Sequence, residues 1–240
     1  MQFDPRTVAR DIPGIFDEIF PQLTPGIVAY FNDQATGIQF EPIPPSLLEI
    51  SRIQRAMLFE LGYAVGEELL EGSTIDWENC FSVALNRQRA FYDAKLPASL
   101  TETDKSIAEI IGRNLSSSLR EISGALVQPL VCGPQIPGLE WISTGRGDFS
   151  AGSTLIEVKC TNRRFSASDY RQVAIYWLLS YAASIEVNGS EWQHFVLLNP
   201  RLGFKVSLNF NNFLGVISSG RTKVDILQLF MALVGSRSIR

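Results

Sequence analysis

The sequence predicts a mixed α/β fold, in which helices cover the faces of a mixed β-sheet. Three patterns lead to this prediction: an apolar stripe with helical spacing, a run of strand-like segments with alternating side chains, and a second helical segment before further strands. The expected core order is helix, three strands, helix, strand, with one more strand appended. We expect this core over residues 101–240 and a mostly helical extension over residues 1–100.

The first hundred residues show helical spacing but no recognisable chemistry, so we interpret them as an accessory or partner module. The elements expected there are a helix at 7–20 interrupted by Pro13-Gly14, a hairpin at 26–40, a helix from the capping box Ser46-x-x-Glu49 to about residue 71, and a helix at 76–93.

The predicted core begins at Thr101-x-x-Asp104, another capping box, whose helix is expected to run to Ser123. The next helix begins at the capping box Ser166-x-x-Asp169. The other elements expected are strands at 125–131, 139–149, 154–160, 193–198 and 204–210, a turn at Asn188-Gly189, and a last helix at 226–234.

The hairpin over residues 139–160 places two carboxylates and a lysine on one face. Side chains alternate along a strand, so Glu157 and Lys159 point the same way. If Ala151-Gly152 is the two-residue turn, Asp148 lies opposite Leu155 and on the face of Glu157. Two carboxylates and a backbone carbonyl suit Mg²⁺, beside which a lysine can orient an attacking water. The alternative is an ordinary solvated strand face.

The helix after the hairpin carries Gln172 and Tyr176 four residues apart on one face. The series Gly-Arg-Gly-Asp148, Ile-Glu157-Val-Lys159 and Gln172-x-x-x-Tyr176 resembles the PD-(D/E)XK, or restriction-endonuclease-like, nuclease superfamily, and its RecB-type branch in particular. The resemblance covers roughly residues 105–210. Gly147 departs from it, because the motif name has proline there.

The resemblance implies a role for each matching residue. Asp148, Glu157 and the carbonyl of Val158 would bind Mg²⁺ or Mn²⁺, Lys159 would be the catalytic lysine, and Gln172 would complete the catalytic set with support from Tyr176. The superfamily often draws another acidic residue from the helix before the strands. Both Glu109 and Glu121 are candidates for it, and the sequence does not decide between them.

Charge is divided unevenly along the chain, whose net charge is −4. Residues 1–139 hold 10 Lys and Arg against 18 Asp and Glu, whereas residues 140–240 hold 11 against 7. The basic half predicts nucleic-acid binding, although solvated surface charge is the alternative. The acidic half suggests a protein partner, which the resemblance implies to be a helicase or sensor subunit. The arginines expected to contact nucleic acid are Arg146, Arg163, Arg164 and Arg171.

Composition excludes several other classes of protein. No apolar run approaches the roughly 18–20 residues that span a bilayer, and the N-terminus lacks signal-peptide features, so we expect a cytoplasmic protein without a membrane partner. Three widely spaced cysteines favour neither disulfides nor a zinc ribbon. His194 is the only histidine, which excludes HNH nucleases and two-histidine phosphodiesterases and disfavours a serine or cysteine hydrolase.

We therefore expect a metal-dependent nuclease that hydrolyses phosphodiester bonds of nucleic acid; DNA is favoured over RNA as the substrate, but the sequence does not decide between them. The resemblance implies a role as the effector of a restriction, repair or anti-phage system. The alternative function is a catalytically inactive nucleic-acid-binding or assembly subunit with the same fold. The sequence leaves open whether cleavage is internal or from an end.

Overall fold

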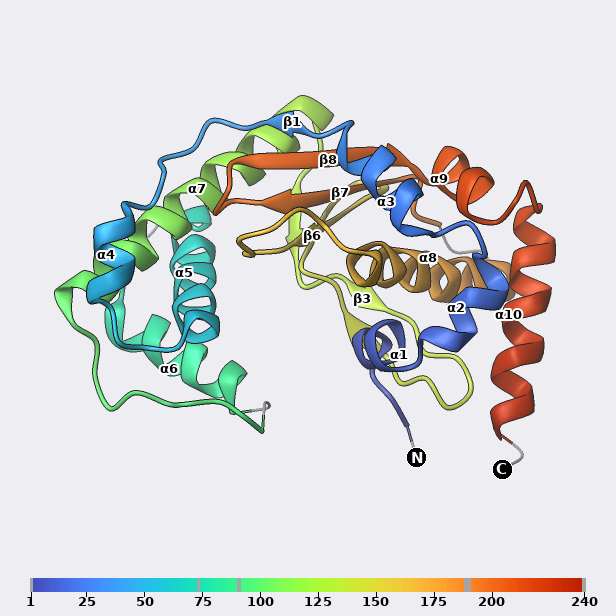
Figure 1. Cartoon of the computed structure of the whole chain (residues 1–240), viewed down its shortest axis with the longest axis horizontal. Coiled ribbons are helices and arrows are strands. Elements are labelled where there is room, and N and C mark those ends of the chain that lie inside the picture. The colour runs from blue at the N-terminus through green and yellow to red at the C-terminus, as the bar shows by residue number, and fades with distance from the viewer. Residues whose placement is uncertain (1, 73, 90–91, 188–190, 239–240) are drawn as a thin grey trace.

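A central sheet with helices on both faces organises the computed structural model, which describes residues 2–72, 74–89, 92–187 and 191–238 (Figure 1). The helices are α1 (Pro5–Asp11), α2 (Pro13–Ile19), α3 (Pro25–Asn32), α4 (Pro45–Ile50), α5 (Arg55–Leu70), α6 (Trp77–Gln88), α7 (Glu102–Leu126), α8 (Ala167–Val187), α9 (Phe210–Ile217) and α10 (Lys223–Ser238). The strands are β1 (Thr36–Gly37), β2 (Leu130–Cys132), β3 (Gln135–Ile136), β4 (Gly145–Arg146), β5 (Phe149–Ala151), β6 (Thr154–Val158), β7 (His194–Asn199) and β8 (Phe204–Asn209).

The main sheet of the described residues has six strands in the order β1-β8-β7-β6-β5-β2. Strands β6 and β7 are parallel and are connected through α8, while the other neighbours are antiparallel. Strands β3 and β4 form a separate ladder. The core order, α7, three strands of the sheet, α8 and two more strands, confirms the predicted mixed sheet with helices on its faces.

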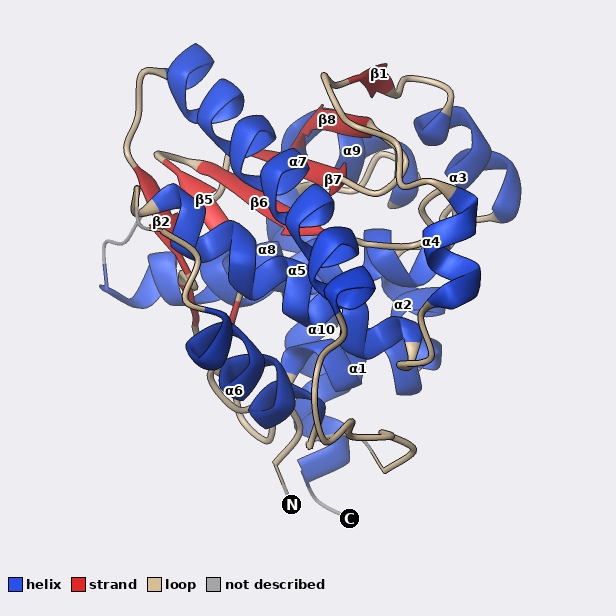
Figure 2. Ribbon diagram, turned by 90° about the vertical axis from the view of Figure 1, so that its left-hand side faces the viewer, coloured by secondary structure: helices blue, strands red, loops and turns tan. Residues whose placement is uncertain are grey.

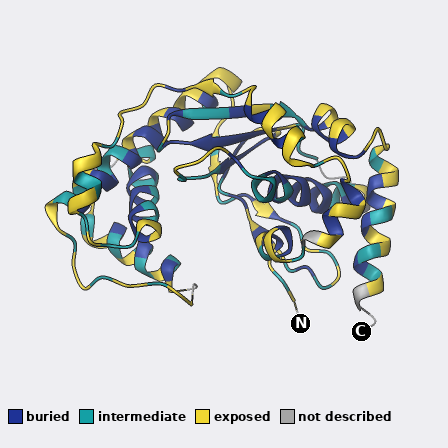
Figure 3. Cartoon of the chain, viewed as in Figure 1, coloured by how far each residue is buried: buried dark blue, intermediate teal, exposed yellow. Residues whose placement is uncertain are grey.

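Side chains of the sheet alternate between two helical layers, as a strand requires. Leu155 of β6 belongs to the apolar cluster of α8, whereas Ile156 belongs to the cluster of α7. Figure 2 shows α7 and α5 lying across one side of the sheet, and Figure 3 shows the deep burial of the strands and α8. Glu157, two residues after Leu155, therefore faces the α8 layer.

Glycines let α5 approach α7 closely. A Cβ atom added to Gly112 of α7 would lie 2.9 Å from the backbone nitrogen of Gly66 in α5, and one added to Gly62 would lie 2.6 Å from Ile111 Cγ2. Tyr63 of α5 stacks on Phe149 of β5, with 5.4 Å between ring centroids. These contacts fix α5 beside the hairpin of β5 and β6.

Two predictions for the N-terminal part are wrong. The expected hairpin at 26–40 is instead α3 and β1, because Pro25 suits a first helical turn and Thr24 caps it. The expected helix at 46–71 is divided into α4 and α5 by an extended Ser51, whose hydroxyl donates to Asp104 Oδ1 at 2.7 Å. Ser46 does not cap α4. The expected interruption at Pro13-Gly14 is confirmed by the separation of α1 from α2.

The core helices are closer to prediction than the strands that precede Asp148. The capping box of Thr101 and Asp104 is confirmed. Helix α7 continues to Leu126, so the strand expected at 125–131 is reduced to β2, and the segment 139–149 holds only β4 and the start of β5. Asp169 Oδ2 accepts hydrogen bonds from Ser166 at the start of α8. The turn expected at Asn188-Gly189 lies outside the described residues.

Helices of the described residues offer no membrane span, because none is both long and apolar enough to cross a bilayer.

Candidate metal and catalytic site

The hairpin of β5 and β6 brings Asp148 and Glu157 together. Phe149 pairs with Ile156 and Ala151 pairs with Thr154, so the turn is formed by Gly152 and Ser153, one residue later than predicted. Gly152 has φ of +56°, which glycine adopts readily. The observed register shifts the cross-strand partner of each β5 residue by two positions from the predicted one. Because side chains alternate with period two, Asp148 stays on the predicted face of the sheet. In this register Asp148 lies opposite Glu157 rather than Leu155.

Main-chain hydrogen bonds fix Asp148 between β4 and β5. Its Oδ2 accepts from the backbone nitrogen of Val158 at 2.8 Å, and its carbonyl oxygen accepts from the nitrogen of Gly133 at 2.8 Å. The nitrogen of Gly147 donates to the carbonyl of Pro134 at 2.9 Å. A proline at position 147 could not make that bond, which gives a physical reason for the departure from the motif.

Glu157, Lys159 and Gln172 form a connected polar group. Lys159 Nζ donates to Glu157 Oε1 at 2.9 Å and to Gln172 Oε1 at 2.8 Å. Gln172 Nε2 donates to Glu157 Oε1 at 2.5 Å and to Tyr176 Oη at 2.9 Å. Glu157 is fully buried, and its Oε2 atom has no hydrogen-bond partner among the described residues. This buried oxygen is therefore the unpaired polar atom of the group.

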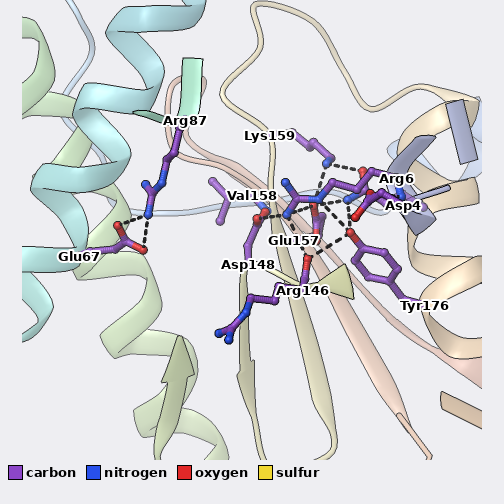
Figure 4. Close-up of polar contacts among 11 residues, drawn as sticks. Asp4, Arg6, Glu67, Arg87, Arg146, Asp148, Glu157, Val158, Lys159 and Tyr176 are labelled. Carbon is purple, nitrogen blue, oxygen red and sulfur yellow. Dashed lines mark hydrogen bonds and ion pairs between the residues drawn. The ribbon is translucent and has the colours of Figure 1, made fainter. Parts of the chain in front are cut away.

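Arg6 of α1 completes the group, and the sequence analysis did not identify it. Its Nη2 atom lies 2.7 Å from Asp148 Oδ1 and 3.8 Å from Glu157 Oε1, and its Nε donates to Tyr176 Oη at 2.9 Å (Figure 4). Arg6 is 142 residues away from Asp148 in the chain. No local pattern marks such a contact, because it depends on α1 packing against α8.

The surroundings separate the pKa values of the two carboxyl groups. Burial and the charge of Asp148 raise the pKa of Glu157 to about 7, although Lys159 and Arg6 act in the opposite direction. Burial also opposes ionisation of Asp148, but Arg6, Lys159 and the Val158 N–H outweigh it and lower its pKa. The two carboxyl groups therefore differ: ionisation is favoured at Asp148 and disfavoured at Glu157.

The carboxylates line a cavity of about 550 Å³ whose far wall belongs to α5 and α6. That wall carries Glu60, Tyr63, Glu67 and Arg87, none of which the sequence analysis selected. Arg87 Nη2 contacts both carboxylate oxygens of Glu67, at 3.0 and 2.7 Å, and Figure 4 shows this pair across from Asp148. Burial raises the pKa of Glu60, and the charge of Asp148 adds to this shift. The cleft thus has a second acidic wall.

Two further cavities adjoin the central one and share different lining residues with it. One of about 540 Å³ shares Arg6 and Arg146 with the central cavity. The other, of about 480 Å³, shares Glu60, Tyr63 and Lys159 with it. The central cavity, which the carboxylates line, adjoins both of the others, and the three together are called the groove below.

Most of the other predicted site residues are not brought to the groove. Arg146 lines it, but Arg163, Arg164 and Arg171 are absent from its described lining. Arg164 pairs with Asp33 at 2.6 Å, and Arg171 Nη1 lies 3.4 Å from the Ala9 carbonyl. The helix acids of α7 are also engaged elsewhere: Glu109 pairs with Arg113 at 2.5 Å, and Glu121 pairs with Lys205 at 2.9 Å.

The donor set of the site fits a hard divalent cation. Asp148 and Glu157 supply carboxylate oxygens, one of them the buried Oε2 without a partner, and the carbonyl of Val158 is adjacent in sequence. Among the described residues no three His, Cys, Asp or Glu side chains are grouped so that they could hold a metal ion together. Water or substrate oxygens would therefore complete the coordination, as Mg²⁺ commonly requires. Comparisons with protein-family models, curated proteins and solved structures gave no match.

Proposed function

We propose that the chain is a metal-dependent nuclease with a restriction-endonuclease-like fold, which hydrolyses phosphodiester bonds in DNA rather than RNA. The observation that carries the proposal is the convergence of Asp148, Glu157 and Lys159 in one cavity, with Gln172 hydrogen-bonded to the last two. Such a set joins oxygen ligands for Mg²⁺ or Mn²⁺ to a cationic group that can act on the attacking water. The choice of DNA follows from the resemblance.

Each residue of the site has a different role in the proposed reaction. Asp148, Glu157 and the Val158 carbonyl would hold the cation, which when bound would neutralise charge that develops on the phosphate. Lys159 gives two of its three donor protons to Glu157 and Gln172, so the third can orient the attacking water or a phosphate oxygen. Gln172 fixes Lys159 and Glu157 relative to each other, and Tyr176 fixes Gln172.

The proposed function also includes a protein partner and further contacts with nucleic acid. The excess of acidic over basic residues in 1–139 suits a protein partner, and the resemblance suggests a helicase or sensor subunit in restriction, repair or anti-phage defence. Arg146 is the predicted nucleic-acid contact that borders the groove. Arg87, on the opposite wall, is a further candidate, because it brings a positive charge to the lining of the same cavity.

Cleavage assays with the full chain test the function. Plasmid, linear duplex, single-stranded DNA and RNA are each incubated with Mg²⁺, Mn²⁺ or EDTA. Cleavage is expected only with metal, and Asp148→Ala, Glu157→Ala and Lys159→Ala should each abolish it with the fold intact. Glu109→Ala and Glu121→Ala are matched controls, because they remove carboxylates that are paired outside the groove. Wild-type cleavage by Glu157→Ala would refute the proposal.

One observation favours a second candidate, an inactive nucleic-acid-binding or assembly subunit. Arg6 already supplies a positive charge to Asp148 and Glu157, as a permanent replacement for a metal would. Isothermal titration with Mn²⁺ separates the two functions. Binding that is lost in both Asp148→Ala and Glu157→Ala supports the nuclease, whereas no such binding supports the inactive subunit.

A further inference from the structure

The carboxylates of the site have a positive partner from a distant part of the chain. Asp148 and Glu157 lie close together inside the protein, where two negative charges require a cation nearby. Lys159 provides a cation at 2.9 Å from Glu157 Oε1, and Arg6 Nη2 provides one at 2.7 Å from Asp148 Oδ1 and 3.8 Å from Glu157 Oε1. The hydrogen bond from Arg6 Nε to Tyr176 Oη, at 2.9 Å, holds the planar guanidinium toward both carboxylates.

A divalent cation held by both carboxylates would need Asp148 Oδ1, the oxygen that Arg6 now uses, because Asp148 Oδ2 accepts from the nitrogen of Val158. Protein oxygens bind Mg²⁺ at about 2.0–2.1 Å, and the ion keeps several waters. Arg6 Nη2 lies 2.7 Å from one of these oxygens. Two cations so close to one carboxylate repel each other strongly in a partly buried site. Metal and guanidinium therefore cannot occupy this position together.

The main chain at Arg6 is fixed, but its side chain has room to move. The nitrogen of Phe3 donates to the carbonyl of Trp141 at 3.0 Å, and Val8 of α1 is fully buried. The Arg6 side chain is 47% exposed. It borders both the central cavity and the neighbouring cavity beside Asp4. Rotation about its side-chain bonds can therefore carry the guanidinium away from the carboxylates without movement of α1.

We propose that Arg6 is a built-in counter-ion that fills the metal position in the metal-free protein and exchanges with the divalent cation. This inference rests on the proposed function, because it requires a metal at Asp148 and Glu157. Metal affinity is then set partly by the ion pair that the metal must break. The displaced guanidinium remains beside Arg146 in the groove, where a substrate phosphate can accept its hydrogen bonds. Metal loading is in this way coupled to substrate binding.

Isothermal titration with Mn²⁺ tests the exchange on the full chain. Arg6→Ala and Arg6→Gln should bind Mn²⁺ about tenfold or more tightly than the wild type, because a competing charge has been removed. Arg10→Ala is the matched control. It removes the same charge from α1, but Arg10 pairs with Asp11 at 3.2 Å and not with the site carboxylates. The Arg10→Ala variant should therefore bind Mn²⁺ with the affinity of the wild type.

A second measurement uses the wild-type protein and does not depend on the folding of a variant. The NMR signal of the Arg6 Nε–H group, identified by its loss in Arg6→Lys, should shift during titration with Mg²⁺. Its midpoint should match that of metal binding. Unchanged or weaker Mn²⁺ binding by Arg6→Ala and Arg6→Gln, or an Arg6 signal that ignores bound Mg²⁺, overturns the exchange alone. If the wild type shows no binding that depends on Asp148 and Glu157, the proposed function fails with it.

Discussion

Lys159 Nζ lies 2.8 Å from Gln172 Oε1, so a lysine at the end of β6 is held by a glutamine in the first turns of α8. The same glutamine donates to Glu157 through Nε2. One side chain therefore fixes both the cationic group and a carboxylate of the proposed site. Its planar amide sets the distance and the direction between them.

Gln172→Leu is expected to lower kcat about 10- to 100-fold, because Lys159 and Glu157 lose their common support and their geometry relaxes. Since Gln172 is not proposed to bind the metal, the Mn²⁺ affinity should change much less than kcat. Cleavage rates measured over a range of Mn²⁺ concentrations separate the two effects. A variant whose kcat equals that of the wild type would show that Gln172 has no positioning role.

The residues that the sequence located correctly are those whose contacts are set locally. Alternation along β6 placed Glu157 and Lys159 on one face, and the spacing in α8 placed Gln172 and Tyr176 together. The predicted turn was one residue out of place, but the error moved partners by two positions and so preserved the face of Asp148. A shift of the cross-strand partners by one position would have placed Asp148 on the opposite face of the sheet.

The residues that the sequence missed reach the site through tertiary packing. Arg6 depends on the way α1 packs against α8, and Glu60 and Arg87 depend on the close contact of α5 with α7. Helical periodicity indicates that a helix buries one face, but not which element covers that face. For the same reason Arg163 and Arg164 belong to the basic half of the sequence and yet do not line the groove.

The close contact of α5 and α7 can be tested with a pair of glycine substitutions in α7. Gly112→Ala is expected to destabilise the protein by about 1–3 kcal/mol, because its Cβ would lie 2.9 Å from the backbone nitrogen of Gly66. Gly124→Ala is the control, since nothing lies within 4 Å of the added Cβ. It should be neutral or stabilising by up to about 1 kcal/mol. Equal free energies of unfolding for the two variants in urea would contradict the packing argument.

The raised pKa of Glu157 predicts a pH-dependent stability in the metal-free protein. A carboxyl group whose pKa rises from 4.5 to about 7 on folding stabilises the folded state at low pH, and this contribution is lost as the pH increases through about 7. Glu157→Gln stays neutral, so in EDTA at pH 8 its Tm should exceed that of the wild type. Each kcal/mol corresponds to roughly 2–4 °C in a protein of this size.

At pH 5 the side chain at position 157 is largely neutral in the folded state of both the wild type and Glu157→Gln. The difference in Tm between these two proteins should therefore largely disappear. Glu121→Gln is a suitable control, because that carboxylate is exposed and pairs with Lys205. A Glu157→Gln variant that melts below the wild type at pH 8 would show that the ionised carboxylate stabilises the fold.

The groove predicts cleavage at internal phosphodiester bonds. The carboxylates lie in its central cavity, and further cavities continue on the Arg146 side and on the Thr161 side. We expect a strand bound in the central cavity to extend into both neighbouring cavities, so that the cleaved bond lies within the strand. Covalently closed plasmid and circular single-stranded DNA have no ends, so the wild type with Mn²⁺ should cut at least one of them. Degradation confined to linear DNA, with mononucleotides as first products, would show that the enzyme acts from an end.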